Sequence, residues 1–221
     1  MAQLLSSSVS RGFYNFLIMI QALSQPVTFE EFIEWYPEHS EHRYELRRGV
    51  IIEMPKPRGK HSEVAGFLSG LLFMYIQRQP SPYFIPKECI IRAEGESGYE
   101  PDVIVLDSVA VKTEPNWEAS SIITQGRSVK LVIEVVSSNW RDDYYFKLAD
   151  YEALGIPEYW IVDYAALGGR KFIGNPKQPT LSVYTLVDGE YQRETFQGSA
   201  KIQSPNFSDL ELTAGQVFSA G

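Results

Sequence analysis

The sequence predicts an α/β fold of the α+β type, in which a central mixed β-sheet is flanked by helices. Two short apolar runs, Val103–Leu106 and Leu131–Val136, have the length and the β-branched composition of buried strands. Between residues 61 and 77, apolar side chains recur at helical spacing, which predicts an amphipathic helix able to cover a sheet. A chain of 221 residues with 44% hydrophobic residues is large enough to bury the core of such a domain.

The segment before that helix predicts a short helix and a hairpin. Thr28 stands where a helix N-cap is expected, and Glu31 follows three residues later, so a capping box predicts a helix over 28–35. Two strand-like runs predict a β-hairpin over 44–54, with its tight turn at Gly49.

The rest of the chain alternates predicted strands with one further helix. In chain order, we expect a strand near 83–92, a glycine-containing turn over 94–98, the strand that begins at Asp102, a polar connection over 108–130, the strand that carries Glu134, a helix over 142–154, a strand over 158–163, and a closing hairpin whose first strand covers 181–187. Gly155 and Pro157 end the predicted helix.

Composition limits the classes of function. The net charge of −8 at pH 7 argues against a protein that coats nucleic acid nonspecifically, because such binding depends on many Lys and Arg contacts to phosphate. Cys89 is the only cysteine, so an intrachain disulfide and a Cys-based zinc site are excluded. A reducing compartment, the cytoplasm, is therefore expected.

Residues 1–25 are expected to be a flexible N-terminal extension ahead of a single domain over 26–221. Phe13–Ile20 is apolar but far too short to span a bilayer as a helix, and no other stretch resembles a membrane segment. The alternatives for this start are a weak signal peptide and a misassigned initiator, with Met19 as the true first residue.

Two acidic residues belong to the two apolar runs. Asp102 precedes Val103–Leu106, and Glu134 lies inside Leu131–Val136. A carboxylate on a buried strand is costly unless it is paired or binds a metal. If the two strands are neighbours, Asp102 and Glu134 would share Mg²⁺ or Mn²⁺, because Mg²⁺ takes one or two carboxylates together with water and substrate phosphate. The alternative is that each acid caps a strand end or pairs with an arginine.

An ordered set of motifs surrounds this pair. Pro101-Asp102 is followed by Glu134-Val135-Val136, then by Lys147, and then by GIPEYWIVD over 155–163. Over residues 26–212 the chain resembles a large, mostly uncharacterised bacterial family of restriction endonuclease-like proteins in the PD-(D/E)XK nuclease superfamily. The resemblance implies a restriction endonuclease-like fold, with a mixed sheet flanked by helices, and metal-dependent cleavage of DNA.

The lysine of the superfamily signature is displaced in this chain. It usually stands two residues after the glutamate, where Val136 stands here, and it orients the attacking water or neutralises developing charge. Members of the family that this chain resembles place a lysine on the following helix, and Lys147 matches that position. Asp143, Lys147 and Tyr151 share one helical face, so Lys147 reaches the metal site if this face looks toward the sheet. The alternative is a surface ion pair between Asp143 and Lys147.

Four other residues each have two possible interpretations, one as part of the site and one as an ordinary structural or surface residue. The resemblance suggests Glu45 as a third acid near the metal, whereas an exposed hairpin carboxylate is the alternative. His61 opens the amphipathic helix, where it would contact phosphate or act as an acid, or else lie exposed to solvent. Glu100 is either a supporting acid or a turn residue, and Glu88 either supports the site or faces water.

A local excess of positive charge precedes the long helix. Residues 43–61 hold six Lys and Arg side chains against only Glu45 and Glu53. Beside a metal site this segment would guide a phosphate backbone. The alternative is a solvated hairpin and loop.

These patterns together predict a metal-dependent endonuclease that hydrolyses DNA phosphodiester bonds with Mg²⁺ or Mn²⁺. Asp102 and Glu134 would be the metal ligands, Lys147 the charge stabiliser, and Glu45 and His61 supporting residues. The alternative is a catalytically inactive nuclease-fold module that binds nucleic acid or protein, and a third option is another metal-dependent hydrolase. A homodimer would suit a protein that cuts both strands of DNA.

Overall fold

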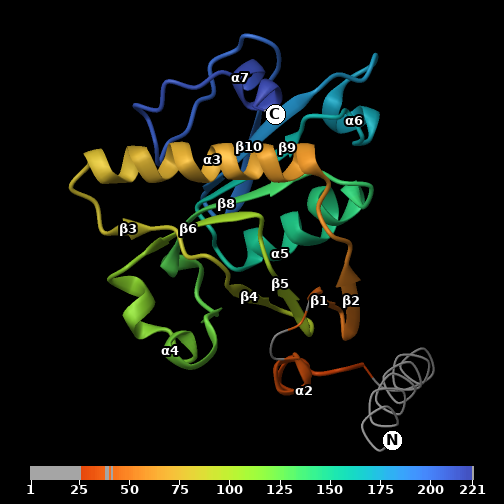
Figure 1. Cartoon of the computed structure of the whole chain (residues 1–221), viewed down its shortest axis with the longest axis vertical. Helices are drawn as coiled ribbons and strands as arrows, with labels where there is room; N and C mark the ends of the chain where they lie inside the picture. Colours follow the sequence, from red (N-terminus) through yellow and green to blue (C-terminus); the bar gives the residue numbers. More distant parts are fainter. Residues whose placement is uncertain (1–25, 38–39, 41, 221) are drawn as a thin grey trace, which may run out of the picture. The chain divides into compact units, whose positions relative to one another are not determined.

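The computed structural model describes residues 26–37, 40 and 42–220, and it divides into two compact units. The first unit holds the described residues up to Pro55 together with Gly95–Gly98. The second holds Lys56–Glu94 and the residues from Tyr99 onward. Figure 1 shows the elements of both units. The predicted extension over 1–25 lies outside the described residues, and the single domain over 26–221 stays a prediction.

The helix of the first unit begins as its capping box predicts. Helix α2 (Phe29–Trp35) has Thr28 as its N-cap. The Thr28 hydroxyl accepts a hydrogen bond from the Glu31 backbone, and the Glu31 carboxylate accepts one from the Thr28 backbone. These two bonds satisfy backbone N–H groups that a helix start otherwise leaves unpaired.

The predicted hairpin is also confirmed. Strands β1 (Arg43–Arg47) and β2 (Val50–Met54) pair antiparallel, and β5 (Ser97–Tyr99) pairs with the other side of β1. The turn between β1 and β2 has left-handed backbone at two successive residues, Arg48 (φ 49°) and Gly49 (φ 77°). That conformation matches the twist of a two-residue hairpin, and glycine adopts it without a steric cost.

A six-stranded mixed sheet forms the centre of the second unit, in the order β11-β10-β9-β8-β6-β3. Its strands are β3 (Tyr83–Phe84), β6 (Val103–Asp107), β8 (Val129–Val135), β9 (Glu158–Asp163), β10 (Thr180–Val187) and β11 (Glu190–Phe196). Strands β8 and β9 run parallel, and the other neighbours in this sheet run antiparallel. The predicted mixed sheet, with its closing hairpin, is confirmed.

Helices cover both faces of this sheet. Successive side chains of each strand point to opposite faces, so each strand contributes residues to both layers. On one face, α3 (Gly59–Arg78) and α7 (Ala214–Ser219) pack on residues such as Val103. On the other face, residues such as Ile104 pack against the segment that leads into α5 (Leu148–Ala153). Figure 1 shows α3 and α5 on opposite sides of β8. Within the described residues, no helix is both long and apolar enough to cross a bilayer.

Two predicted elements differ from the structure. The single strand predicted near 83–92 is two strands, β3 and β4 (Ile90–Ala93), separated by a segment in which Pro86 has no backbone N–H to donate to a ladder. The helix predicted over 142–154 begins as a π-helix over Asp142–Lys147 and continues as α5. In a π-helix the hydrogen bonds close wider turns than in an α-helix.

The connection predicted to be polar over 108–130 is folded around one buried carboxylate. Glu114 accepts hydrogen bonds of 2.6–3.1 Å from the backbone and hydroxyl of Thr124, the backbone of Gln125 and the hydroxyl of Ser128. Around it lie a 3₁₀ turn (Ala110–Thr113), α4 (Trp117–Ser120), β7 (Ile122–Ile123) and a second 3₁₀ turn (Gly126–Ser128). Strand β7 pairs parallel with β4.

Candidate active site

The strands that carry Asp102 and Glu134 are neighbours, as a shared site requires. Strands β6 and β8 pair with Val103 opposite Ile133, which places Asp102, one residue before β6, opposite Glu134. Asp102 Oδ2 accepts a hydrogen bond of 2.8 Å from the Val135 backbone N–H. The two side chains are only 10% and 4% exposed, so each carboxylate needs a compensating partner.

Lys147 is the partner of Glu134. Its Nζ lies 3.0 Å from Glu134 Oε1 and 3.9 Å from Asp143 Oδ1, and its side chain is 4% exposed. The Tyr151 hydroxyl donates to the same Glu134 oxygen over 3.0 Å. The helical face that carries residues 143, 147 and 151 therefore looks toward the sheet. The alternative of a surface Asp143–Lys147 pair is wrong, because both side chains are buried.

The surroundings of Val136 are apolar, which disfavours a lysine at this position and agrees with the placement of the lysine at residue 147. Val136 is 1% exposed and packs in the apolar cluster that contains Tyr144 and Tyr159. A lysine at this position would bury its charge among apolar side chains. Lys147 instead approaches Glu134 from the segment that covers this face of the sheet.

His61 is the partner of Asp102. Its Nε2 lies 3.2 Å from Asp102 Oδ2 and its side chain is 11% exposed, so the alternative of a solvent-exposed histidine is wrong. Burial opposes the charged imidazole, but the hydrogen bond and the charge of Asp102 outweigh it and raise the pKa of His61. Burial likewise opposes ionisation of Asp102, yet His61, the Val135 N–H and the charge of Lys147 hold the pKa of Asp102 below its usual range. The two groups form an ion pair when His61 is protonated.

Tyr99 and Asp150 also belong to this cluster, although neither was among the predicted site residues. The Tyr99 hydroxyl donates to Asp150 Oδ2 over 2.6 Å, and the centre of its ring lies 5.6 Å from Lys147 Nζ. The same ring meets Tyr151 edge-on at 5.9 Å. Asp150 stands three residues after Lys147, which is the one signal that places it on the same side of the helix. Tyr99 had no such signal in the sequence, because it directly follows the turn predicted over 94–98 and belongs to no predicted element.

The structure brings four of the five predicted site residues together in the second unit. Glu45 lies on β1 of the first unit and is 1% exposed, so the alternative of an exposed hairpin carboxylate is wrong, while its role beside a metal stays a prediction. Glu88 faces water and pairs with Lys87 at 3.0 Å. Glu100 is half-buried.

The carboxylates of Asp102 and Glu134 are oxygen ligands of the type that a hard divalent cation prefers. Mg²⁺ is commonly held by one or two carboxylates, with water and substrate phosphate as the remaining oxygen ligands. Within the part of the chain that the structure describes, no group of three or more His, Cys, Asp and Glu side chains is arranged to hold a metal. Asp102 and Glu134 would thus need phosphate or water oxygens beside them. An ion would also share these carboxylates with His61 and Lys147.

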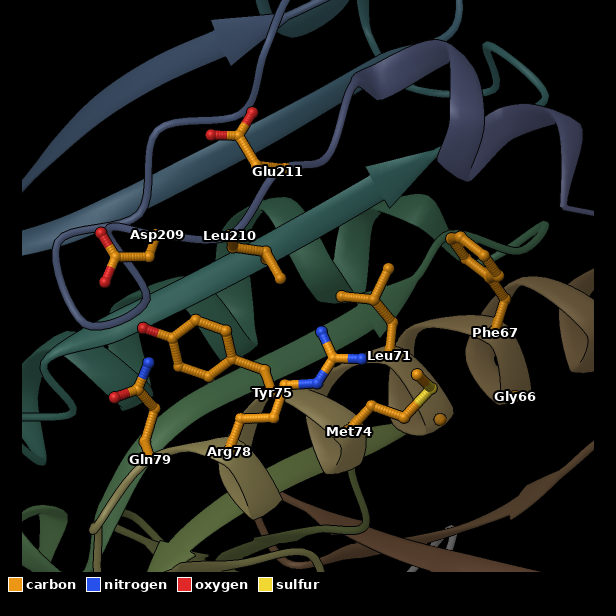
Figure 2. A pocket seen from close by; sticks show the side chains of 11 residues that line it. Gly66, Phe67, Leu71, Met74, Tyr75, Arg78, Gln79, Asp209, Leu210 and Glu211 are labelled. Atoms are coloured by element: carbon orange, nitrogen blue, oxygen red, sulfur yellow. The ribbon is translucent and has the colours of Figure 1, made fainter.

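A cavity of about 680 Å³ opens elsewhere on the second unit. Figure 2 shows it between α3 and the segment 209–211, with the apolar side chains of Leu71, Tyr75 and Leu210 along it. None of the predicted site residues lines this cavity. His61, at the start of α3, precedes all the residues of α3 that line it.

Comparison with known proteins agrees with the predicted fold. The family model described as "Putative restriction endonuclease" (Uma2) matches residues 29–215. A similar solved structure is that of a protein described as a putative nuclease belonging to DUF820, from Anabaena variabilis ATCC 29413. The match has a TM-score of 0.67 and 22% sequence identity, and covers 88% of this chain and 99% of that chain. At this identity the likeness shows the fold, which confirms the restriction endonuclease-like prediction. A search of curated proteins gave no match.

Proposed function

We propose, because the chain belongs to the Uma2 family of restriction endonuclease-like proteins, that it is a metal-dependent endonuclease that hydrolyses DNA phosphodiester bonds with Mg²⁺ or Mn²⁺. The contact between the buried Lys147 ammonium and Glu134, with Asp102 on the neighbouring strand, is the observation that carries this proposal. It gathers two carboxylates and one cation at the same end of the sheet. Phosphodiester hydrolysis uses groups of these two kinds.

Each residue of the cluster has a distinct role in this reaction. Asp102 and Glu134 would hold the divalent ion, which when bound polarises the phosphate and lowers the pKa of a water molecule. As the water oxygen bonds to phosphorus and the bond to the leaving oxygen breaks, Lys147 stabilises the negative charge that gathers on the phosphate oxygens. Tyr151 fixes Glu134 through its hydrogen bond, and His61 keeps Asp102 ionised. Glu45 is retained as a proposed third acid.

The start of α3 supports DNA as the substrate. Lys56 and Arg58 are exposed and Lys60 is half-buried, and these three basic residues lie within the five residues before His61, which contacts Asp102. Basic side chains beside a hydrolytic site neutralise the phosphates that flank the bond to be cut. The overall charge of −8 confines that attraction to a local surface.

Cleavage of supercoiled plasmid in Mg²⁺ or Mn²⁺ tests the proposal. We expect Asp102→Ala and Glu134→Ala each to lower the rate by at least about 100-fold, the loss typical when a group that stabilises the transition state is removed. Glu88→Ala is the matched control, because Glu88 is an exposed acid paired with Lys87. Circular dichroism checks that the variants fold. Wild-type rates in both site variants would refute the assigned ligands.

Metal binding provides a readout that does not depend on turnover. We expect titration with Mn²⁺, followed by electron paramagnetic resonance, to show binding to the wild-type chain and to Glu88→Ala. Binding should be lost in Asp102→Ala and Glu134→Ala. Equal Mn²⁺ affinity in all four proteins would place the ion elsewhere.

A second candidate function is a nuclease-fold module that binds nucleic acid or protein without cutting. The observation in its favour is that both carboxylates already have a partner, because Asp102 contacts the imidazole of His61 and Glu134 contacts the ammonium of Lys147. This function predicts association with DNA, no cleavage, and no bound Mn²⁺ at millimolar metal. A Mn²⁺ anomalous signal between Asp102 and Glu134 in a crystal would contradict it.

A homodimer is also part of the proposed function, because two copies would bring one site to each DNA strand. Analytical ultracentrifugation with and without duplex DNA measures the mass. A monomer under both conditions would contradict this part of the proposal and leave the assigned site unaffected.

A further inference from the structure

Three aromatic rings and two cations meet on the surface of the second unit. Trp140 and Tyr145 come from the segment after β8, and Phe172 comes from α6 (Arg170–Ile173). The three ring centres lie 5.4–6.3 Å apart. Lys171 Nζ lies 4.4 Å from the centre of the Tyr145 ring, and the Arg141 guanidinium lies 4.6 Å from that of Trp140. We call these five residues the aromatic–cationic patch.

Two of the three rings of the patch pack against the residues beneath them. Phe172 stacks on the buried ring of Tyr144 with the ring centres 4.4 Å apart. Trp140 lies against the backbone of Gly169, where an added Cβ would come within 3.0 Å of the indole. Tyr145 nevertheless remains 42% exposed, and Lys171 and Arg141 are exposed as well. Partly exposed apolar groups that polar residues surround often mark interaction sites.

The patch lies at the same end of the sheet as the candidate active site. Strands β8 and β9 run parallel with Val135 opposite Val162, so the chain leaves both strands at one end of the sheet (Figure 1). The segment with Trp140 and Tyr145 follows β8, and α6 follows β9. Glu134 lies at this end of β8. In the π-helical turn Lys147 is buried against Glu134, whereas Tyr145 faces outward.

We propose that the aromatic–cationic patch binds single-stranded DNA: an unpaired base takes the place of the Lys171 ammonium over the Tyr145 ring, and Lys171 and Arg141 turn to the flanking phosphates. Proteins that bind single strands combine aromatic stacking with a basic surface in this way. The inference rests on the proposed function, because it assigns a class of substrate to the same site.

The charges around the rings favour an anionic partner with an aromatic face, such as a nucleic acid, over an apolar protein surface. Besides Arg141 and Lys171, the Arg193 guanidinium lies 5.9 Å from the centre of the Phe172 ring. Of the two acids in the adjacent turn, Asp143 is buried beside Lys147 and Asp142 is half-buried. An apolar partner would bury these cations without compensation, which is costly. A nucleotide supplies both an aromatic face and an anion.

The patch also favours an unpaired base over a duplex. In a duplex the bases already stack on each other, and the rings of the patch would reach only sugar and phosphate. An unpaired base offers its face to the rings, and such stacking is tolerant of sequence. We therefore expect a preference for single strands that depends on the patch.

Fluorescence anisotropy in EDTA tests this preference without cleavage. The probes are a labelled oligothymidylate of about 20 nucleotides and a blunt duplex of the same length. The double variant Tyr145→Ala/Lys171→Ala is compared with Phe73→Ala/Lys87→Ala, which removes an exposed aromatic residue and an exposed lysine elsewhere. We expect the patch variant to weaken single-strand binding by about tenfold or more and duplex binding by less than about twofold. The control variant and Tyr145→Phe, which keeps the ring, should bind as the wild type.

Four results would overturn the inference. These are unchanged single-strand affinity in the patch variant, equal losses on single strand and duplex, no single-strand binding by the wild type, and a shift from dimer to monomer with unchanged DNA affinity. The last result would assign the patch to a second copy of the chain. Because binding is measured without metal, each of these results is distinguishable from loss of plasmid cleavage, which tests the active site.

Discussion

Replacement of Lys147 by methionine tests the buried ammonium most directly. Methionine retains much of the length and packing of the side chain, but it removes the charge that lies 3.0 Å from Glu134 and 3.9 Å from Asp143. Removal of one partner from a buried ion pair costs about 3–5 kcal/mol, because the other charge stays buried. In a chain of this size each kcal/mol lowers Tm by about 2–4 °C, so we expect a fall of about 6–20 °C at neutral pH.

Differential scanning calorimetry and urea unfolding measure this loss, and two further variants make it specific. Lys201→Met removes a pair that is closer, at 2.7 Å to Glu211, but 45% and 80% exposed, so it should cost at most about 1 kcal/mol. Lys147→Met combined with Glu134→Gln should be more stable than the sum of the single losses predicts, because no charge is left unpaired at Glu134. Plasmid cleavage should fall by about 100-fold in Lys147→Met.

Two outcomes would contradict these roles of Lys147. If Lys147→Met lost no more stability than the surface variant, Lys147 would not be a buried partner of Glu134. If stability fell as expected while cleavage continued at the wild-type rate, the ion pair would be structural and the lysine would have no part in the reaction.

Three further predictions concern His61, Tyr151 and Cys89. The stability difference between the wild type and His61→Gln should be largest between about pH 4 and 6.5. The pKa of Asp102 is lowered in the folded chain, so its contribution to stability is lost as the pH falls through that folded-state pKa. The pKa of His61 is raised in the folded chain, so its contribution is lost as the pH rises through that folded-state pKa. Urea unfolding of both proteins across this range measures it, and a larger difference at about pH 8.5 would contradict it. Tyr151→Phe should cost about 1 kcal/mol through the lost hydrogen bond to Glu134, and an unchanged Tm would argue against that bond. Burial raises the pKa of Cys89 to about 12, so thiol reagents should label it only after unfolding, and rapid labelling of the native chain would show an accessible thiol.

Local patterns predicted much of the fold and of the cluster. The capping box at Thr28 and the turn at Gly49 have local causes, so the sequence alone located α2 and the hairpin. The apolar runs around Asp102 and Glu134 located β6 and β8, which pair as expected. For Lys147, helical spacing and the family resemblance together pointed to the side of the helix that meets Glu134.

The parts that were missed depend on contacts distant in the sequence. Tyr99 joins the site through a hydrogen bond to Asp150, which is 51 residues away in the sequence. Glu114 organises the 108–130 connection by accepting bonds from residues 10–14 positions later, and no periodicity records such a role. The sequence predicted His61 as a supporting residue, but the helical pattern alone did not indicate its burial or its contact with Asp102.

The α-helical spacing of Asp143, Lys147 and Tyr151 predicted that they share one face, and in the structure they do so because of a π-helical turn that this spacing does not include. In a regular α-helix of 3.6 residues per turn, side chains four apart drift by about 40° around the axis, so Asp143 and Tyr151 would point about 80° apart. The π-helical turn over Asp142–Lys147 rotates the chain less per residue and offsets that drift. This explains how Asp143 lies within 3.9 Å of Lys147 while Lys147 and Tyr151 both meet one oxygen of Glu134. The same turn leaves Tyr145 outside, so the wider turn both assembles the buried cluster and presents the aromatic–cationic patch.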